Sequence, residues 1–124
     1  MFAGASAVED VLRRNANNHL HVLVVWEPIL PMDWARPNRW VRSRINDPRV
    51  TQFWDKDHLV ATQLKQAFPT SRKLCCQRNG VLWDVAAVYS SGLEWGTPPD
   101  YFGGAVLDVA DEVSHRLSVI PVNR

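Results

Sequence analysis

The sequence lacks the marks of a small secreted or membrane-spanning protein. Its only two cysteines are adjacent, Cys75 and Cys76, and do not form a spaced disulfide framework. No hydrophobic run is long enough to span a membrane. Glu9 and Asp10 interrupt the segment in which a secretory signal would need apolar residues. These absences predict a cytoplasmic protein that does not bind membranes.

An excess of charge of either sign is also absent. The chain has 14 basic and 13 acidic residues, a formal net charge of +1, so no overall field attracts nucleic acid. The sequence contains no glycine-rich phosphate loop, no Ser-His-Asp arrangement and no metalloprotease motif. We therefore expect no nucleic-acid partner and no cofactor.

The composition that remains is that of an ordinary globular domain. The chain has 124 residues, of which 46% are hydrophobic and 22% charged. This length suffices for one continuous core but not for two. The prediction is a single domain spanning residues 1–124 that folds unaided.

The first half predicts helices alternating with strands. Ser6 and Glu9 have capping-box spacing, which predicts a helix at about residues 6–15. The β-branched run 19–26 predicts a central strand covered on both faces. The next predicted elements are a helix from Pro37 to about Ile45, a strand at Val50–Trp54, and a helix capped by Asp55 or Asp57 that ends at Pro69.

The second half predicts a hairpin followed by a helix. Residues 70–80 form a polar, basic loop that contains the cysteine pair. A strand over 81–89 turns into a short partner strand at 93–95. Residues 98–104 then lead into a last helix with an apolar stripe over 106–117. The crossover helices make the first two strands parallel, and the last two strands are antiparallel.

This order, a βαβ unit followed by a ββα unit, resembles the thioredoxin-like superfamily over about residues 19–117. The resemblance implies an α/β fold around a four-stranded mixed sheet, to which the N-terminal helix is an addition. The strings VVWEPILPMDW, DPRVTQFWD, CCQRNGVLWDVAAVY and FGGAVLDVADEV are also similar to those of a bacterial subgroup of thioredoxin-like proteins that lacks the CxxC motif.

The resemblance fails at the motif that carries the family's chemistry. Trp26-Glu27-Pro28-Ile29-Leu30 stands where the family has Trp-Cys-x-x-Cys, so Trp26 matches but no cysteine is present. The family's cis-proline before the third core strand is missing too, and Cys75-Cys76 stands in that region. The resemblance thus implies that both thiols approach the family's functional face from the opposite side.

Cys75 and Cys76 are the candidate catalytic residues. Adjacent thiols can cycle through an eight-membered disulfide ring or chelate a thiophilic ion. Three nearby basic residues, Arg72, Lys73 and Arg78, would favour the thiolate. The alternative is one buried thiol that packs as a small hydrophobe and one inert surface thiol.

Trp26, Glu27 and Asp84 are the candidate binding residues that line the facing site. Glu27 at the end of the first strand and Asp84 within an apolar strand could form a buried pair that handles protons. The structural alternative, which we favour, is that Asp84 accepts a hydrogen bond from an arginine or a tryptophan N–H and Glu27 helps to cap the next helix.

A pair of histidines and a basic segment are better explained as solvated surface than as functional sites. His19 and His21 lie on the same side of a strand, but no third ligand is near them in sequence, so no metal site is predicted. A basic segment interleaved with Trp34 and Trp40 could bind nucleic acid or an acidic partner, yet a solvated helix face accounts for it better. Its arginines are Arg36, Arg39, Arg42, Arg44 and Arg49.

Two functions follow from these residues. The first is a thiol redox protein that uses the vicinal cysteines. The second is a non-catalytic module on the same scaffold that binds a protein partner or forms a homodimer through exposed tryptophans such as Trp34 and Trp40.

Overall fold

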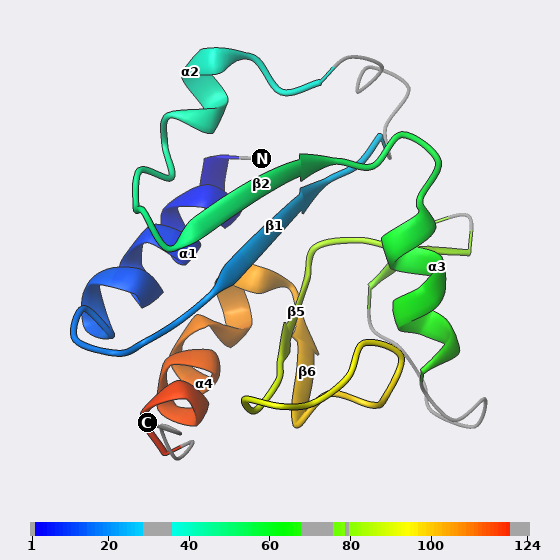
Figure 1. Cartoon of the computed structure of the whole chain (residues 1–124). Helices are drawn as coiled ribbons and strands as arrows, with labels where there is room; N and C mark the ends of the chain where they lie inside the picture. The colour runs from blue at the N-terminus through cyan, green and yellow to red at the C-terminus, as the bar shows by residue number, and fades with distance from the viewer. Residues whose placement is uncertain (1, 29–35, 68–75, 79, 120–124) are drawn as a thin grey trace.

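The computed structural model describes residues 2–28, 36–67, 76–78 and 80–119 (Figure 1). Its helices are α1 (Phe2–Arg14), α2 (Arg39–Arg42), α3 (Leu59–Gln66) and α4 (Val106–Val119). Its strands are β1 (Val22–Trp26), β2 (Val50–Trp54), β3 (Gln77–Arg78), β4 (Val81–Leu82), β5 (Val85–Val88) and β6 (Tyr101–Gly104). The chain is therefore a mixed α/β protein, as predicted.

Helix α1 begins earlier than its sequence predicts. It starts at Phe2 instead of near Ser6, so the predicted capping box is wrong. The Glu9 side chain instead accepts a hydrogen bond from the backbone N–H of Asn46, 2.9 Å away. Ala5 and Leu12 form the buried stripe of the helix. Glu9 thus ties α1 to the segment before β2.

Strands β1 and β2 form the predicted parallel pair. Their register runs from Val22 opposite Val50 to Trp26 opposite Trp54, and α2 lies in the connection between them. The strand begins at Val22, three residues later than predicted, and His19 and His21 precede it. The βαβ unit of the prediction is confirmed.

Only one face of this pair is well covered. Val22, Val24 and Trp26 pack against the cluster of Ala5, Leu12 and Ile45, which comes from α1 and the segment after α2. On the other face, the side chain of Leu23 is 62% exposed and that of Phe53 48%. The prediction of a strand covered on both faces is wrong, because α1 and Ile45 share one face.

The second half departs further from the prediction. The run 81–89 is not one strand, because Asp84 takes a left-handed conformation with φ of 53° and separates β4 from β5. The partner of β5 is β6, with Val85 opposite Gly104 and Val88 opposite Tyr101. The predicted partner at 93–95 lies in the exposed connection between them. Two glycines in β6, a residue type depleted in strands, concealed it.

The described strands form three two-stranded sheets: β1 with β2, β3 with β4, and β5 with β6. A single four-stranded sheet is therefore not shown within this part of the chain. Helix α4 packs against β5, β6 and α1, and α3 packs against β4 (Figure 1). A second core cluster, Leu64, Leu82 and Phe102, joins α3 to β4 and β6.

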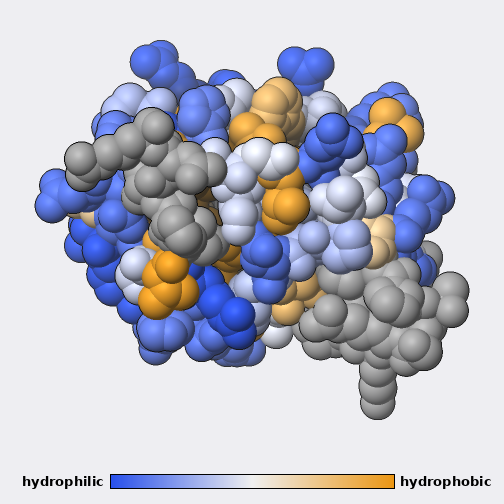
Figure 2. Space-filling model, turned by 60° about the horizontal axis from the view of Figure 1, so that its bottom comes forward, coloured by the Kyte–Doolittle hydropathy of each residue, from blue (hydrophilic) through white to orange (hydrophobic). Residues whose placement is uncertain are grey.

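The surface of the molecule is mostly hydrophilic on the face shown in Figure 2, where hydrophobic residues form separate spots. Isolated apolar side chains of this kind are ordinary on protein surfaces. Among the described residues, no helix combines the length and apolarity that a membrane span requires.

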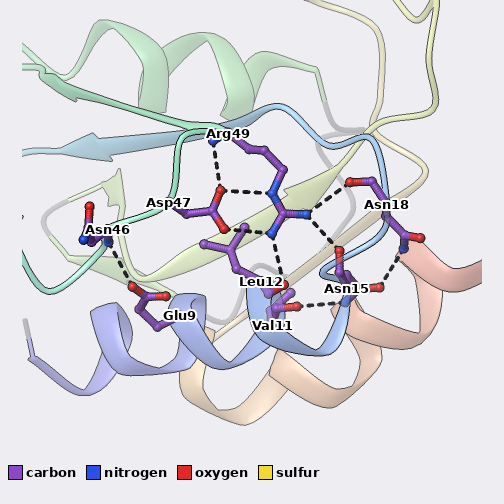
Figure 3. Close-up of polar contacts among 8 residues, drawn as sticks. All are labelled: Glu9, Val11, Leu12, Asn15, Asn18, Asn46, Asp47 and Arg49. Carbon is purple, nitrogen blue, oxygen red and sulfur yellow. Dashed lines mark hydrogen bonds and ion pairs between the residues drawn. The ribbon is translucent and has the colours of Figure 1, made fainter.

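Arg49 joins α1 to the parallel strands (Figure 3). Its guanidinium donates to the carbonyl oxygens of Leu12, Asn15 and Asn18 at 3.1, 2.8 and 3.1 Å. Of these, Leu12 lies in the last turn of α1 and Asn15 directly follows the helix, where carbonyl oxygens lack the full set of helical partners. Asp47 holds the guanidinium in place through contacts of 3.0 Å to Nε and 2.8 Å to Nη2. The Arg49 side chain thus ties the C-terminal end of α1 to the residue that directly precedes β2.

Asn15 fastens the same helix end to α4. Its side chain is buried and donates to the Val11 carbonyl at 2.9 Å and to the Ser114 hydroxyl at 3.0 Å. The ion pair between Arg14 and Asp111, 2.8 Å long, adds a second link to α4. The C-terminal end of α1 therefore contacts both the segment before β2 and helix α4.

The Asp47–Arg49 contact gives the stability of the protein a defined pH dependence. The Arg49 side chain and backbone N–H lower the pKa of Asp47 from 3.8 to about 2. A lowered carboxyl pKa stabilises the fold above pH 3.8, and this stabilisation is lost as the pH falls toward about 2. We expect Asp47→Asn to lower the free energy of unfolding at neutral pH and to flatten its fall across this window, as measured by urea denaturation.

Asp111→Asn is the matched control, because that carboxylate is 94% exposed and its ion pair contributes little. An Asp47→Asn profile that parallels the wild-type profile through the acid range would show that the contact has no influence on stability.

Candidate functional site

Cys76 lies at the start of the β3–β4 hairpin. Its carbonyl accepts a hydrogen bond from the Trp83 N–H at 3.2 Å. The residue is partly buried and its sulfur is disulfide-bonded. Cys75, the only other cysteine of the chain, lies outside the described residues. One of the two predicted catalytic residues is thus placed, in an oxidised form.

Gly104 forms the wall next to this sulfur. A Cβ atom built on Gly104 would lie 2.6 Å from Cys76 Sγ and 2.7 Å from the Asp84 carbonyl oxygen. Real Cβ atoms do not approach other atoms so closely, so this position requires glycine. The end of β6 therefore brings Cys76 and Asp84, two of the predicted site residues, to one point.

The carboxylate of Asp84 has a structural partner. Asp84 Oδ1 accepts a hydrogen bond from the Val106 N–H, 3.1 Å away, at the first residue of α4. The residue is exposed, so the prediction of a buried carboxylate is wrong. The reason is the left-handed turn at Asp84, which ends the apolar strand and turns the side chain toward α4. The donor is a helix N–H and not the arginine or tryptophan expected.

Glu27 pairs with His58 at the carboxyl ends of the parallel strands. Glu27 Oε2 lies 2.9 Å from His58 Nδ1, and the two side chains are 12% and 25% exposed. His58 has a left-handed backbone with φ of 58° and directly precedes α3. Burial raises the pKa of Glu27, His58 opposes this rise, and the charge of Asp55 adds to it. Glu27 does not cap α2, whose N-cap is Asn38.

Asp55 and Trp26 complete this end of the sheet. The Asp55 carboxylate accepts hydrogen bonds from the N–H groups of Leu59 and Val60 at 3.0 and 2.8 Å, so it partners the first N–H groups of α3 as predicted, although the N-cap position itself is His58. Its own N–H donates to the Trp26 carbonyl at 2.8 Å. The Trp26 indole N–H donates to Gln52 Oε1, also at 2.8 Å. Trp26 is therefore held by β2.

The predicted site residues thus fall into two groups: Cys76 with Asp84 beside Gly104, and Trp26 with Glu27 at the end of β1. The hydrogen bonds of Glu27 and Asp84 go to different elements, α3 and α4, so the two carboxylates do not form a hydrogen-bonded pair. His58 was missed in the sequence. The sequence did carry a signal for this pairing. Glu27 follows β1 and His58 follows β2, and the carboxyl ends of parallel strands lie at the same edge of a sheet.

The histidines differ in their exposure. His19 and His21 are exposed, as expected, whereas His58 is partly buried against Glu27. Across the described ranges, no group of three or more His, Cys, Asp or Glu side chains could hold a metal ion.

Comparison with known proteins found no match: no family model, curated protein or solved structure is similar to this chain.

The close contact at Gly104 predicts a steric cost for a side chain there. Gly104→Ala must push a methyl group against the Asp84 backbone, which cannot rotate away, so we expect a loss of about 1–3 kcal/mol in the free energy of unfolding. Gly4→Ala in α1 is the control, since nothing lies within 4 Å of its Cβ position and alanine favours the helix by about 1 kcal/mol. Equal stability of the two variants in urea denaturation would contradict the contact.

The Glu27 environment predicts pKa changes of opposite sign in two variants. His58→Ala removes the hydrogen bond and charge that lower the pKa of Glu27, so this pKa should rise further. Asp55→Asn removes a negative charge and retains an acceptor for the helix cap, so the pKa of Glu27 should fall. Carbon-13 NMR titration of the Glu27 carboxyl measures both shifts. Shifts of the same sign in both variants would refute the arrangement.

Proposed function

We propose that the protein is a thiol redox protein, on a thioredoxin-like scaffold, in which Cys75 and Cys76 cycle between a dithiol and a vicinal disulfide. The observation that carries the proposal is the disulfide-bonded state of Cys76 in a chain whose only other cysteine is its neighbour. A ring closed by two adjacent cysteines is small and readily reduced, as suits a reversible couple.

The exchange proceeds through a mixed disulfide with a partner protein. One thiolate of the reduced pair attacks a disulfide of the partner, and one partner sulfur leaves as a thiolate. The second cysteine of the pair then attacks the mixed disulfide, which closes the vicinal disulfide and releases the second partner sulfur. Two electrons pass to the partner, and the two thiol protons end on its sulfurs. A dithiol reductant returns the pair to its starting state.

The surroundings of Cys76 support this chemistry. The sulfur is partly buried beside Gly104, and basic residues stand at positions 72, 73 and 78 of the sequence. Positive charge near a thiol favours its thiolate, which is the attacking form. In the proposal, Trp26 and Glu27 line the opposite wall of the site, and Asp84 holds the turn that carries β5 past the sulfur.

The order of the strands and helices also supports the proposal. A parallel β1–α2–β2 unit is followed by the antiparallel pair β5–β6 and then by α4, which is the order of the thioredoxin fold. A reducing compartment such as the cytoplasm would supply the reductant that the cycle needs.

A protein-binding or self-associating module is the second candidate. Three exposed side chains favour it: Leu23 and Phe53 on the open face of the parallel strands, and Trp40 on α2, which is 60% exposed. Trp34, the other tryptophan proposed for this role, lies outside the described residues. Large exposed apolar and aromatic side chains are those that anchor interfaces.

Alkylation separates the two candidates. The untreated protein should resist iodoacetamide and take two labels after reduction, because both sulfurs are oxidised in the resting state. The reduced pair should react with an apparent pKa below the value of about 8.5 of an ordinary thiol. Mass spectrometry counts the labels, and Cys76→Ser should take one label whether or not it is first reduced.

The double variant Cys75→Ser, Cys76→Ser decides the function. It should lose the ability to reduce a small aromatic disulfide while retaining the circular dichroism of the wild type. Two ordinary, permanently accessible thiols would contradict the redox function. Retention of a dimer by the double variant in light scattering would then favour the binding module.

A further inference from the structure

The described arginines differ sharply in their partners. Four of them form ion pairs with carboxylates: Arg13, Arg14, Arg49 and Arg116. Arg36, Arg39 and Arg42 are exposed, and within the described part of the chain they form no ion pair. Three exposed arginines without an ion-pair partner among the described residues thus lie within seven consecutive positions of the sequence.

Helix α2 fixes two of these arginines on one side. Asn38 caps the helix by accepting from the Val41 N–H at 2.9 Å, and the Val41 side chain is buried. Arg39 and Arg42 are three residues apart, so they are neighbours on the helix surface. The helix lies at the edge of the molecule, away from β5 and β6 (Figure 1).

An aromatic ring stands among these charges. Trp40 is 60% exposed, and the Arg44 guanidinium carbon lies 4.9 Å from the centroid of its ring. This cation–π contact helps to hold the ring on the surface. Tryptophan and arginine are both enriched among the residues that dominate binding energy at protein interfaces.

We propose that this basic patch, formed by Arg36, Arg39, Trp40 and Arg42, binds an acidic segment of a partner protein. The guanidinium groups match carboxylates geometrically, because each can donate two parallel hydrogen bonds to one carboxylate. Trp40 packs against an apolar residue that lies between the acidic ones. The partner is thus a peptide in which carboxylates alternate with apolar side chains.

An acidic peptide fits the patch better than a nucleic acid does. The carboxylate of Glu9 accepts a hydrogen bond from the Asn46 N–H, two residues after Arg44, so one negative charge lies near this end of the segment. A negative charge here disfavours a long polyanion more than a short acidic peptide. The net charge of +1 also provides no long-range attraction for a polyanion.

The test uses the full-length chain and a fluorescein-labelled peptide of glutamates interrupted by leucine. Fluorescence polarisation should show binding that weakens as salt is raised. The variant Arg36→Gln, Arg39→Gln, Arg42→Gln should bind about tenfold or more weakly, since three charge contacts are lost. Trp40→Ala should also bind more weakly, with the salt dependence unchanged.

The matched control removes the same charge elsewhere. Arg13→Gln, Arg14→Gln, Arg116→Gln should retain wild-type affinity, and an equal loss in this control would overturn the proposal. Failure of the peptide to bind the wild type would overturn it as well. Tighter binding of an oligothymidine than of the peptide, lost in the patch variant, would replace the acidic partner with a nucleic acid. The double cysteine-to-serine variant should bind the peptide normally, which separates this surface from the redox chemistry.

Discussion

The contact between Asp47 and Arg49 fixes how the first half of the chain is arranged. Arg49 satisfies the carbonyl oxygens of Leu12, Asn15 and Asn18, and its own carbonyl accepts the Val22 N–H at 3.0 Å. The residue therefore ends α1, shapes the turn that follows and sets the first pairing between β1 and β2. A planar group with five fixed donors is suited to this task in a way that a lysine is not.

Once the parallel register is set at Val22, it determines which side chains meet at the far end of the strands. Four residues later, Trp26 and Trp54 are opposite each other. The chain positions that follow them bring Glu27 to His58 and Asp55 to the start of α3. The raised pKa of Glu27 results from this burial. The same parallel register therefore relates the Asp47–Arg49 ion pair near the amino ends of the strands to the Glu27–His58 contact at their carboxyl ends.

The second half follows a different constraint, the close approach at Gly104. Only a residue without a side chain allows β6 to pass between Cys76 Sγ and the Asp84 carbonyl. Asp84 makes the approach feasible, because its left-handed turn separates β4 from β5 and its carboxylate then caps α4. The cysteine sulfur therefore lies directly against the backbone of β6.

Local patterns in the sequence determined the parallel βαβ unit, the Asp55 cap and the last helix, because hydrophobic period, capping residues and prolines act within a few residues. They could not determine the strand at 101–104, the break at Asp84 or the pairing of Glu27 with His58. The glycines of β6 have no strand propensity of their own, and a strand of that kind forms only because β5 and α4 hold it. Contacts between residues distant in the sequence exist only after the chain has folded, so the tertiary structure alone decided them.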